Sequence, residues 1–197
     1  MKTLLYNKET AGKVSDALFN KILHMMLAME SKRAREAFTE GLQTVLTQTG
    51  LLKPEILEAI KDMNRIKKGM ADLVLDFEKV LAALEKVNGF IDESKTSVVE
   101  TTALLFNILN LLRSSEYSVR DYAQHSITKL IQNIPDPVFF SCEKWILTQV
   151  KLNHDELVIK SLLLTYKLFI GKQVAGSVSV DLYPLIDTQK NEEDFFT

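Results

Sequence analysis

The spacing of apolar residues constrains this chain most, because they recur at steps of three and four along most of its 197 residues. That spacing places side chains on one face of an α-helix, whereas the strict alternation typical of strands is almost absent. Only 7 Gly and 4 Pro are present, fewer than the many tight turns of an all-β fold need. Hydrophobic residues make up 46% of the chain and charged residues 25%, so it has enough apolar surface to fold. The sequence therefore predicts an all-α protein.

The first half of the chain predicts four helices. Ser31 is placed to cap the second helix, and Pro54, at a first-turn position, opens the third. The first and second are expected to form a hairpin over about residues 13–28 and 31–50, and the fourth to start around Gly69 and stop at Gly89. The apolar stripes of the four helices are Val14, Leu18, Ile22, Met25, Met26 and Met29; Ala34, Phe38, Leu42, Val45 and Leu46; Ile56, Leu57 and Ile60; and Leu73, Phe77, Val80, Leu81, Leu84 and Val87.

The second half shows a sharper pattern after a polar stretch at residues 92–96. An apolar helix ending near Leu112 and the short turn 113–116 lead to a second helix, and a break at Pro135 and Pro137 precedes a third over residues 139–152. The stripe of the second helix repeats 39 residues later, close to the period of about 40 to 47 residues in HEAT and armadillo repeats. The paired positions are Val119 with Val158, Ala123 with Leu162, Ile127 with Tyr166, Leu130 with Phe169, and Ile131 with Ile170.

These patterns predict a HEAT- or armadillo-like α-solenoid of antiparallel helix pairs. Residues 1–91 are expected to form N-terminal helical hairpins and residues 97–171 HEAT-like helix pairs. Residues 172–197 are expected to be an irregular acidic tail at which the chain is truncated from a longer protein. In this interpretation the small Ala123 lets helices approach closely, while Val119 fills the gap to the neighbouring repeat.

Groups able to carry out chemistry are sparse in the sequence. Cys142 is the only cysteine, which excludes an internal disulfide, and its apolar surroundings are typical of a small buried hydrophobe. His24, His125 and His154 have no partner at a metal-ligand spacing, and no glycine-rich phosphate loop occurs. We therefore expect no enzyme activity, no catalytic residue, no metal, no cofactor and no small-molecule substrate. No apolar run approaches the roughly 18 residues that span a bilayer, so a membrane is not an expected partner.

Two basic clusters are candidates for contact with RNA phosphates or an acidic partner. The net charge of −2 gives the chain no general attraction to nucleic acid, so any such contact is local. One cluster lies near the end of the third helix, where Lys61, Arg65 and Lys68 are expected to share one helix face and Lys67 to lie off it. Positive charge there also complements the helix dipole, which is the structural alternative. The candidate contact residues are Lys61, Arg65, Lys67 and Lys68, and Lys32, Arg33 and Arg35 at the start of the second helix.

Four segments carry a family resemblance. Residues 75–88, Leu-Asp-Phe-Glu-Lys-Val-Leu-Ala-Ala-Leu-Glu-Lys-Val-Asn, resemble the Asp-Phe-Glu-x-Arg-Leu-x-Ala-Phe-type helix of the DRIM (down-regulated in metastasis) family. Residues 104–109 are similar to its Leu-Leu-Tyr-Asn-Cys-Leu segment and residues 118–123 to its Ser-Ile-Arg-x-x-Ala helix start. Residues 193–196 resemble its acidic Asp-Phe-Phe element.

The resemblance implies a function. Members of that family are very large nucleolar HEAT-repeat scaffolds of the small-subunit processome, associated with the U-three small nucleolar RNP and needed for maturation of 18S ribosomal RNA. The expected function is therefore a non-catalytic scaffold in the nucleus and nucleolus, with processome proteins, pre-rRNA and the small nucleolar RNP as partners. A generic HEAT or armadillo adaptor for protein–protein interaction is the alternative. A small helical enzyme is disfavoured because no acid, base or metal constellation is present.

Overall fold

The computed structural model describes residues 16–49, 52–67, 74–92 and 96–175, with the backbone alone at 16–20, 44–49 and 173–175. Within these ranges the chain forms eight α-helices and one short 3-10 helix, and its one extended pairing is an isolated bridge between Ile66 and Leu75. The all-α prediction is confirmed. None of the described helices is long and apolar enough to cross a membrane. The elements are α2 (Asp16–Ala28), α3 (Lys32–Thr49), α4 (Pro54–Met63), α5 (Phe77–Asp92), α6 (Val98–Leu111), α7 (Tyr117–Leu130), η1 (Ile131–Asn133), α8 (Asp136–Leu152) and α9 (Glu156–Ala175).

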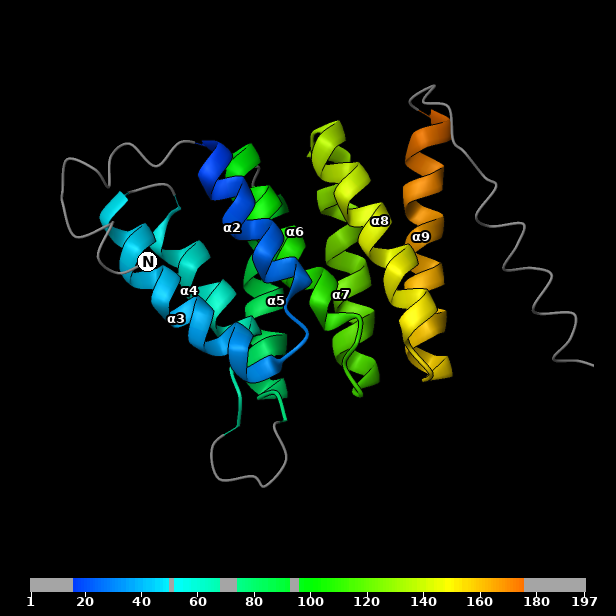
Figure 1. Cartoon of the computed structure of the whole chain (residues 1–197), viewed down its shortest axis with the longest axis horizontal. Helices are drawn as coiled ribbons and strands as arrows, with labels where there is room; N and C mark the ends of the chain where they lie inside the picture. Colours follow the sequence, from blue (N-terminus) through cyan, green and yellow to red (C-terminus); the bar gives the residue numbers. More distant parts are fainter. Residues whose placement is uncertain (1–15, 50–51, 68–73, 93–95, 176–197) are drawn as a thin grey trace, which may run out of the picture.

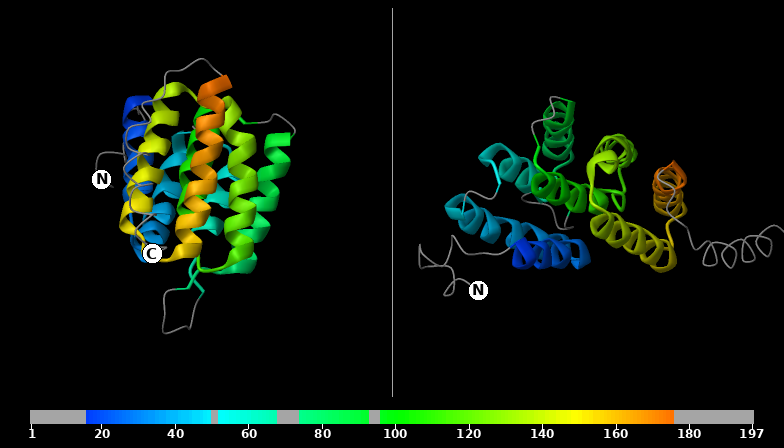
Figure 2. Two further views of the ribbon diagram at one scale, coloured as in Figure 1. Left: turned by 90° about the vertical axis from the view of Figure 1, so that its right-hand side faces the viewer. Right: turned by 90° about the horizontal axis from the view of Figure 1, so that it is seen from above.

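Three consecutive helix pairs, α4–α5, α6–α7 and α8–α9, stand side by side (Figure 1). The first helices of the pairs form one layer and the second helices another, as the view from above shows (Figure 2). Each pair packs against the next in both layers. This stacking of helix pairs against their neighbours alone is the arrangement of an α-solenoid, as predicted.

The two N-terminal helices depart from the predicted hairpin. α2 packs against α6 and α3 packs against α4, and the two make few contacts with each other within the described residues. They therefore form a third layer that covers the α4–α6 side of the stack (Figure 2). The predicted stripe residues Ile22, Met26 and Leu42 are buried there, whereas Ala34 and Met25 are exposed. Val14, Leu18, Val45, Leu46 and Leu73 lie outside the described side chains.

Helix α6 is the centre of the core. Every residue from Glu100 to Leu111 is buried, because α2, α4, α7 and α8 all pack around it. A helix that is apolar on all sides is one that other elements surround, and this explains the dense apolar run in the sequence. Its buried polar groups are paired: the side-chain amide of Asn107 donates to the Ala103 carbonyl at 2.8 Å, and Asn64, the residue after α4, donates to Asn107 Oδ1 at 2.7 Å.

Several helix starts follow the predicted local chemistry. The Ser31 hydroxyl accepts from the Ala34 N–H at 3.3 Å, and Pro54 is the first residue of α4. Ser97 and Glu100 form a capping box at the start of α6, in which each side chain accepts from the other's backbone N–H. The turn at residues 113–116 and the helix that follows it are also confirmed.

Four helix boundaries differ from the sequence prediction, two of them in α5. Helix α5 begins at Phe77, not around Gly69, because Val74 and Asp76 bond the chain before it to Lys67 and Arg65; it also continues through Gly89 to Asp92. Glycine inside a helix costs only about 1 kcal/mol relative to alanine, which core packing outweighs.

Prolines and glycines explain the other two differences. Helix α8 begins at Asp136, so Pro137 lies in its first turn, where no backbone donor is needed. Helix α9 runs past Gly171 to Ala175, further than the predicted end of the helical pairs.

Candidate nucleic-acid and partner contact surfaces

The first predicted basic cluster is divided between surface and core. Arg33 is exposed and Lys32 is half-buried, but Arg35 is only 5% exposed. Its guanidinium donates from Nη1 to the carbonyls of Met29 at 2.7 Å and Glu30 at 2.9 Å, just beyond the end of α2. Arg35 is therefore a structural residue that satisfies carbonyls at a helix end, and its assignment as a surface contact is wrong.

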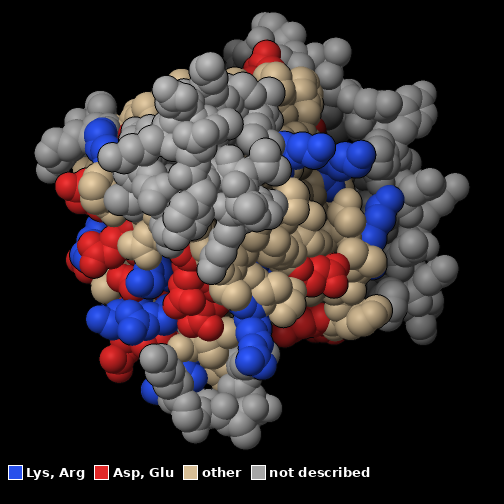
Figure 3. All heavy atoms as spheres, turned by 60° about the vertical axis from the view of Figure 1, so that its left-hand side comes forward, with Lys and Arg blue, Asp and Glu red and all other residues tan. Residues whose placement is uncertain are grey.

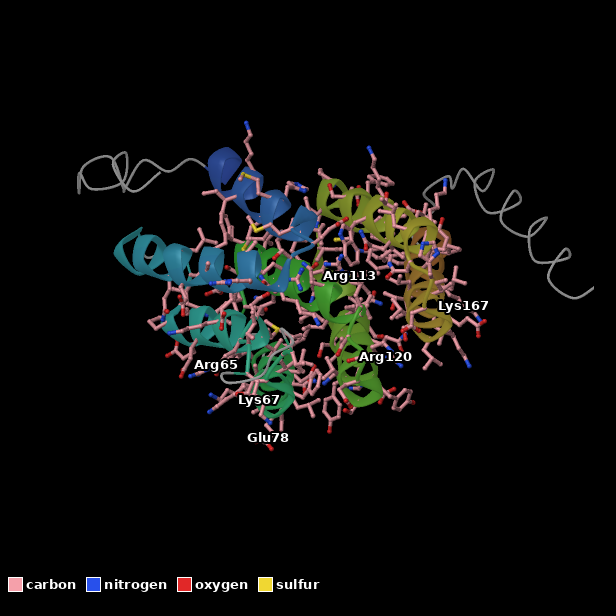
Figure 4. The ribbon with its side chains drawn as sticks, turned by 60° about the horizontal axis from the view of Figure 1, so that its bottom comes forward. Arg65, Lys67, Glu78, Arg113, Arg120 and Lys167 are labelled. Atoms are coloured by element: carbon pink, nitrogen blue, oxygen red, sulfur yellow. The ribbon has the colours of Figure 1, made fainter. Side chains whose placement is uncertain are left out.

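The second predicted cluster has a different geometry from the expected one. Helix α4 ends at Met63, so Lys61 lies in its last turn while Arg65 and Lys67 follow in the bridged segment. Lys61 and Arg65 therefore do not share one face of a helix, and Lys68 lies outside the described residues. Arg65 and Lys67 are both exposed and lie near each other, with Glu78 of α5 close by (Figure 4).

Acidic groups accompany the basic ones on this part of the surface. Arg65 Nη1 lies 3.6 Å from Asp62 Oδ1, and acidic and basic side chains are interspersed on the face that Figure 3 shows. Ion pairs between exposed groups are worth little energy and are screened by salt. The pair of exposed cations at Arg65 and Lys67 is thus a local positive site and not part of a broad basic surface.

A buried junction that sequence reasoning did not find joins four elements. Arg113, in the turn after α6, donates to Asn110 Oδ1 at 2.8 Å, to Gln149 Oε1 of α8 at 3.2 Å and to the Met29 carbonyl at 3.5 Å. Its guanidinium lies 5.6 Å from the ring of Trp145, and the Trp145 indole N–H donates to the Leu27 carbonyl at 3.0 Å. The end of α2 is therefore bonded by residues from α3, α8 and the α6–α7 turn.

The two arginines of this junction carry buried positive charge. Burial, together with the nearby charge of Arg113, lowers the pKa of Arg35 to about 10, and burial lowers the pKa of Arg113 as well. With a pKa of about 10, Arg35 remains protonated near neutral pH. The carbonyl oxygens at the end of α2 carry the negative end of the helix dipole, which favours cations there.

Arg120 repeats the role of Arg35 in another helix pair. It is the fourth residue of α7, as Arg35 is of α3, and each donates to carbonyls six and five residues before it. The Arg120 bonds reach Ser114 at 2.7 Å and Ser115 at 2.9 Å, and its Nε donates to Ser161 Oγ of α9 at 3.2 Å. In α9 the fourth residue is Ile159, which has no such capacity. An arginine four residues into a helix after a short polar turn is the sequence signal for this role.

A groove of about 1040 Å³ runs between α7 and α9. Tyr122 and Leu164 line it and are 46% and 49% exposed, so apolar side chains lie in solvent there. Lys167 lies on the exposed side of α9 (Figure 4). Tyr122 and Leu164 lie off the predicted apolar stripes, so the helical spacing gave no signal for this groove.

Potentially reactive side chains do not converge in the described part of the chain. His24, His125 and His154 are all exposed and lie on different elements, and no group of three histidine, cysteine or acidic residues is arranged to hold a metal among the described residues. Cys142 is fully buried, as predicted, and burial raises the pKa of its thiol. A protonated, enclosed thiol is a poor nucleophile.

A comparison with models of protein families shows to which family the chain belongs. Residues 1–151 match the family model described as U3 small nucleolar RNA-associated protein 20, N-terminal. The chain belongs to this family. Its matched part includes Arg35, Arg113, Arg120 and Trp145, so the buried junction and both helix-end arginines lie within the family region. Helix α9, one wall of the groove, lies beyond it.

Membership confirms the family resemblance noted in the sequence. The family implies a role in the small-subunit processome and in ribosome biogenesis, and it suggests association with processome components and a nuclear or nucleolar location. No match was found among curated proteins or among solved structures.

Proposed function

We propose that this chain is a non-catalytic scaffold that supports small-subunit processome assembly and 18S pre-rRNA processing in the nucleolus. The family match over residues 1–151 carries the proposal. Stacked helix pairs present long surfaces on both layers, and solenoids of this type use such surfaces to bind extended partners. The partners are processome proteins, pre-rRNA and the small nucleolar RNP.

The repeated arginine supports assignment of the helix pairs as HEAT repeats. Arg35 and Arg120 occupy equivalent positions and make equivalent bonds, although they lie in differently packed parts of the stack. The 39-residue register also joins α7 to α9, since Val119, Ala123 and Ile127 and their counterparts Val158, Leu162 and Tyr166 are all buried. The same arginine bonds and the same buried positions therefore recur along the chain, which favours repetition of one structural unit.

A scaffold is favoured over an enzyme by the placement of the polar groups. The buried polar side chains of the core, such as Asn64, Asn107 and Arg120, are bonded to helix carbonyls or to one another. Groups used in this way stabilise packing and are not available for proton transfer or nucleophilic attack. Cys142 is buried, and burial raises the pKa of its thiol, which favours the protonated form.

Arg65 and Lys67 are the residues we assign to phosphate contact. They are exposed, near each other, and held by a backbone bridge in which the Lys67 N–H donates to the Val74 carbonyl at 2.9 Å and the Asp76 N–H to the Arg65 carbonyl at 2.9 Å. These backbone bonds hold the segment that carries the two cations in place. Contacts of this kind are sequence-independent and weaken as salt rises.

Co-purification tests the proposal. A tagged form of the whole chain, expressed in eukaryotic cells, should recover U3 small nucleolar RNA, precursors of 18S ribosomal RNA and processome proteins. The Arg65→Glu/Lys67→Glu variant should recover less pre-rRNA and show a smaller salt dependence. The matched control is Lys79→Glu/Lys86→Glu, which makes the same charge change at two exposed lysines of α5.

The outcomes separate the possible functions. Recovery of a different protein set without processome RNA would favour the generic helical adaptor and reject the processome role. Equal loss in both charge variants would show a general electrostatic effect and reject the assignment of Arg65 and Lys67. Unchanged recovery in the Arg65→Glu/Lys67→Glu variant would also reject it.

A further inference from the structure

The groove between α7 and α9 is held open by polar bonds across its base. Gln124 Nε2 donates to the Ser161 carbonyl at 2.8 Å, and Arg120 Nε donates to Ser161 Oγ at 3.2 Å. At the far end, Lys172 Nζ donates to the Ile131 carbonyl at 2.6 Å. These bonds fix the register of the two helices and leave Tyr122 and Leu164 above the base, in solvent.

The groove is also polarised along its length. Asp121 lines the end where α7 begins, and Lys167 and Lys172 line the end toward the last turn of α9. Lys172 also donates to the Ile134 carbonyl at 3.3 Å, and burial lowers its pKa, so Lys167 is the more exposed cation of this end. Leu164 lies between the two ends, so cations at one end adjoin an apolar middle. A peptide with acidic residues next to bulky apolar ones has the complementary pattern.

We propose that this groove binds an acidic–aromatic peptide, and that its occupant is the chain's own segment 191–196, Asn-Glu-Glu-Asp-Phe-Phe. In the bound form the acidic residues of this segment lie toward Lys167, and the two phenylalanines lie against Tyr122 and Leu164. The region 176–197 contains five acidic residues and one lysine, so its charge is opposite to that of the lysine end of the groove.

The length of the connecting chain permits this contact. Residues 176–190 separate the end of α9 from the segment, and 15 extended residues span about 50 Å. Lys167 lies eight residues before Ala175, which at 1.5 Å per residue is about 12 Å along the helix. A tether much longer than the span it has to cross keeps the segment at a high effective concentration near the groove.

Paramagnetic relaxation in the whole chain tests the contact directly. A Thr197→Cys substitution places a nitroxide beside Phe196, and the one native cysteine, Cys142, is buried and protected from the label. The nitroxide should broaden the methyl signals of Leu164 and Leu168, which line the groove, and leave Met25 on α2 unaffected. The label should have no such effect after reduction.

Matched variants identify the chemistry of the contact. Phe195→Ala/Phe196→Ala and Lys167→Glu should each lower the paramagnetic rates at Leu164 and Leu168 by about threefold or more, because these rates follow the docked population. Lys160→Glu, an exposed lysine of α9 outside the groove, is the charge control and should change little. Combining Lys167→Glu with Glu193→Lys should restore the rates toward those of the unaltered chain.

Two results would overturn the proposal. One is the absence of broadening at Leu164 and Leu168 in the unaltered labelled chain, or broadening that neither Lys167→Glu nor the phenylalanine variant reduces. The other is a shift of these methyl signals on adding an oligouridine RNA, with no effect of the nitroxide before addition, which would assign the groove to RNA instead.

Discussion

Arg35 and Arg120 show how a single buried side chain closes a helix–turn–helix unit. A helix end leaves carbonyls without partners, and burying them unpaired is costly. Each arginine reaches back to two carbonyls at the end of, or just beyond, the preceding helix, and its long stem fills space between the helices. The residue therefore couples a local turn to the packing around it.

Replacing Arg35 should destabilise the chain far more than replacing its neighbour Arg33. Arg35→Ala removes the donor to the Glu30 carbonyl, leaves the Met29 carbonyl only the 3.5 Å bond from Arg113, and opens a gap, so we expect a loss of about 2–4 kcal/mol in the free energy of unfolding. Arg33 is exposed, and Arg33→Ala should change it by less than about 0.5 kcal/mol. Urea denaturation measures both. Equal effects would contradict the structural role of Arg35.

Glu100 should make stability depend on pH. Burial alone would raise the pKa of this carboxyl, but hydrogen bonds from the backbone N–H groups of Ser97 and Lys53, the Ser97 side chain and the charge of Lys53 lower it below its usual value. A carboxyl with a lowered pKa in the folded state adds stability that is complete above the unfolded pKa near 4.5 and is lost as pH falls further.

The Glu100→Gln variant tests this dependence. We expect the unaltered chain to be more stable at neutral pH by about 1–2 kcal/mol, the range for loss of a helix cap, and the difference to shrink as the pH falls below 4.5. Urea midpoints between pH 7 and pH 3 measure the trend. Glu58→Gln, at an exposed position of α4, serves as the control and should show little difference. A constant difference for Glu100→Gln would contradict the pKa argument.

At the scale of elements, α2 is held mainly by its contacts with other parts of the chain. It packs on α6, and its carboxyl end is bonded by Arg35, Arg113 and Trp145. Helices of this length are marginal alone in water, so tertiary contacts determine whether they form. Weakening the junction of Arg35, Arg113 and Trp145 should therefore lower the stability of α2.

Removing the indole donor should loosen α2 selectively. Trp145→Phe keeps an aromatic ring but loses the hydrogen bond to the Leu27 carbonyl, so we expect a loss of about 1–2 kcal/mol in the free energy of unfolding. Amide hydrogen exchange in α2 should rise more than in α5, which is remote from Trp145 in the element contacts. Tyr122→Phe, at an exposed ring, is the control. Uniform acceleration across all helices would show a global effect instead.

For the whole molecule, the α8–α9 pair exposes several large apolar side chains. Leu152 and Leu157 flank the turn between the two helices and are 56% and 60% exposed, and Phe140 is 46% exposed. Apolar groups gathered on a surface favour association. We expect the chain to self-associate weakly as its concentration rises.

Charged substitutions at the α8–α9 turn should reduce that association. Leu152→Glu/Leu157→Glu should shift the sedimentation profile toward the monomer, with an unchanged helical circular dichroism spectrum, because both positions are exposed. The control is Ser118→Glu/Asn133→Glu, which adds the same charge at exposed polar positions. If both pairs act equally, net charge and not the apolar turn controls association.

The helical class, several helix limits and the family could all be predicted from the sequence alone. These follow from local physics: the three-and-four spacing, Ser31 and Pro54 at helix starts, and the turn after α6 depend on neighbours within a few residues. The repeated stripe of α7 and α9 was also visible, because the same buried face recurs after 39 residues. The DRIM-like segments gave the family without any tertiary information.

The roles of individual polar residues depend on tertiary contacts and could not be predicted from the sequence. Arg33 and Arg35 are alike in sequence, yet one is exposed and the other buried, because the end of α2 lies over only one of them. Lys61 and Arg65 do not share the predicted helix face, because α4 ends at Met63. The residues after it pair with a segment about ten positions away, through the bridge between Ile66 and Leu75. The groove, the junction at Arg113 and the packing of α2 and α3 as a third layer all depend on contacts between residues distant in sequence, which no local pattern encodes.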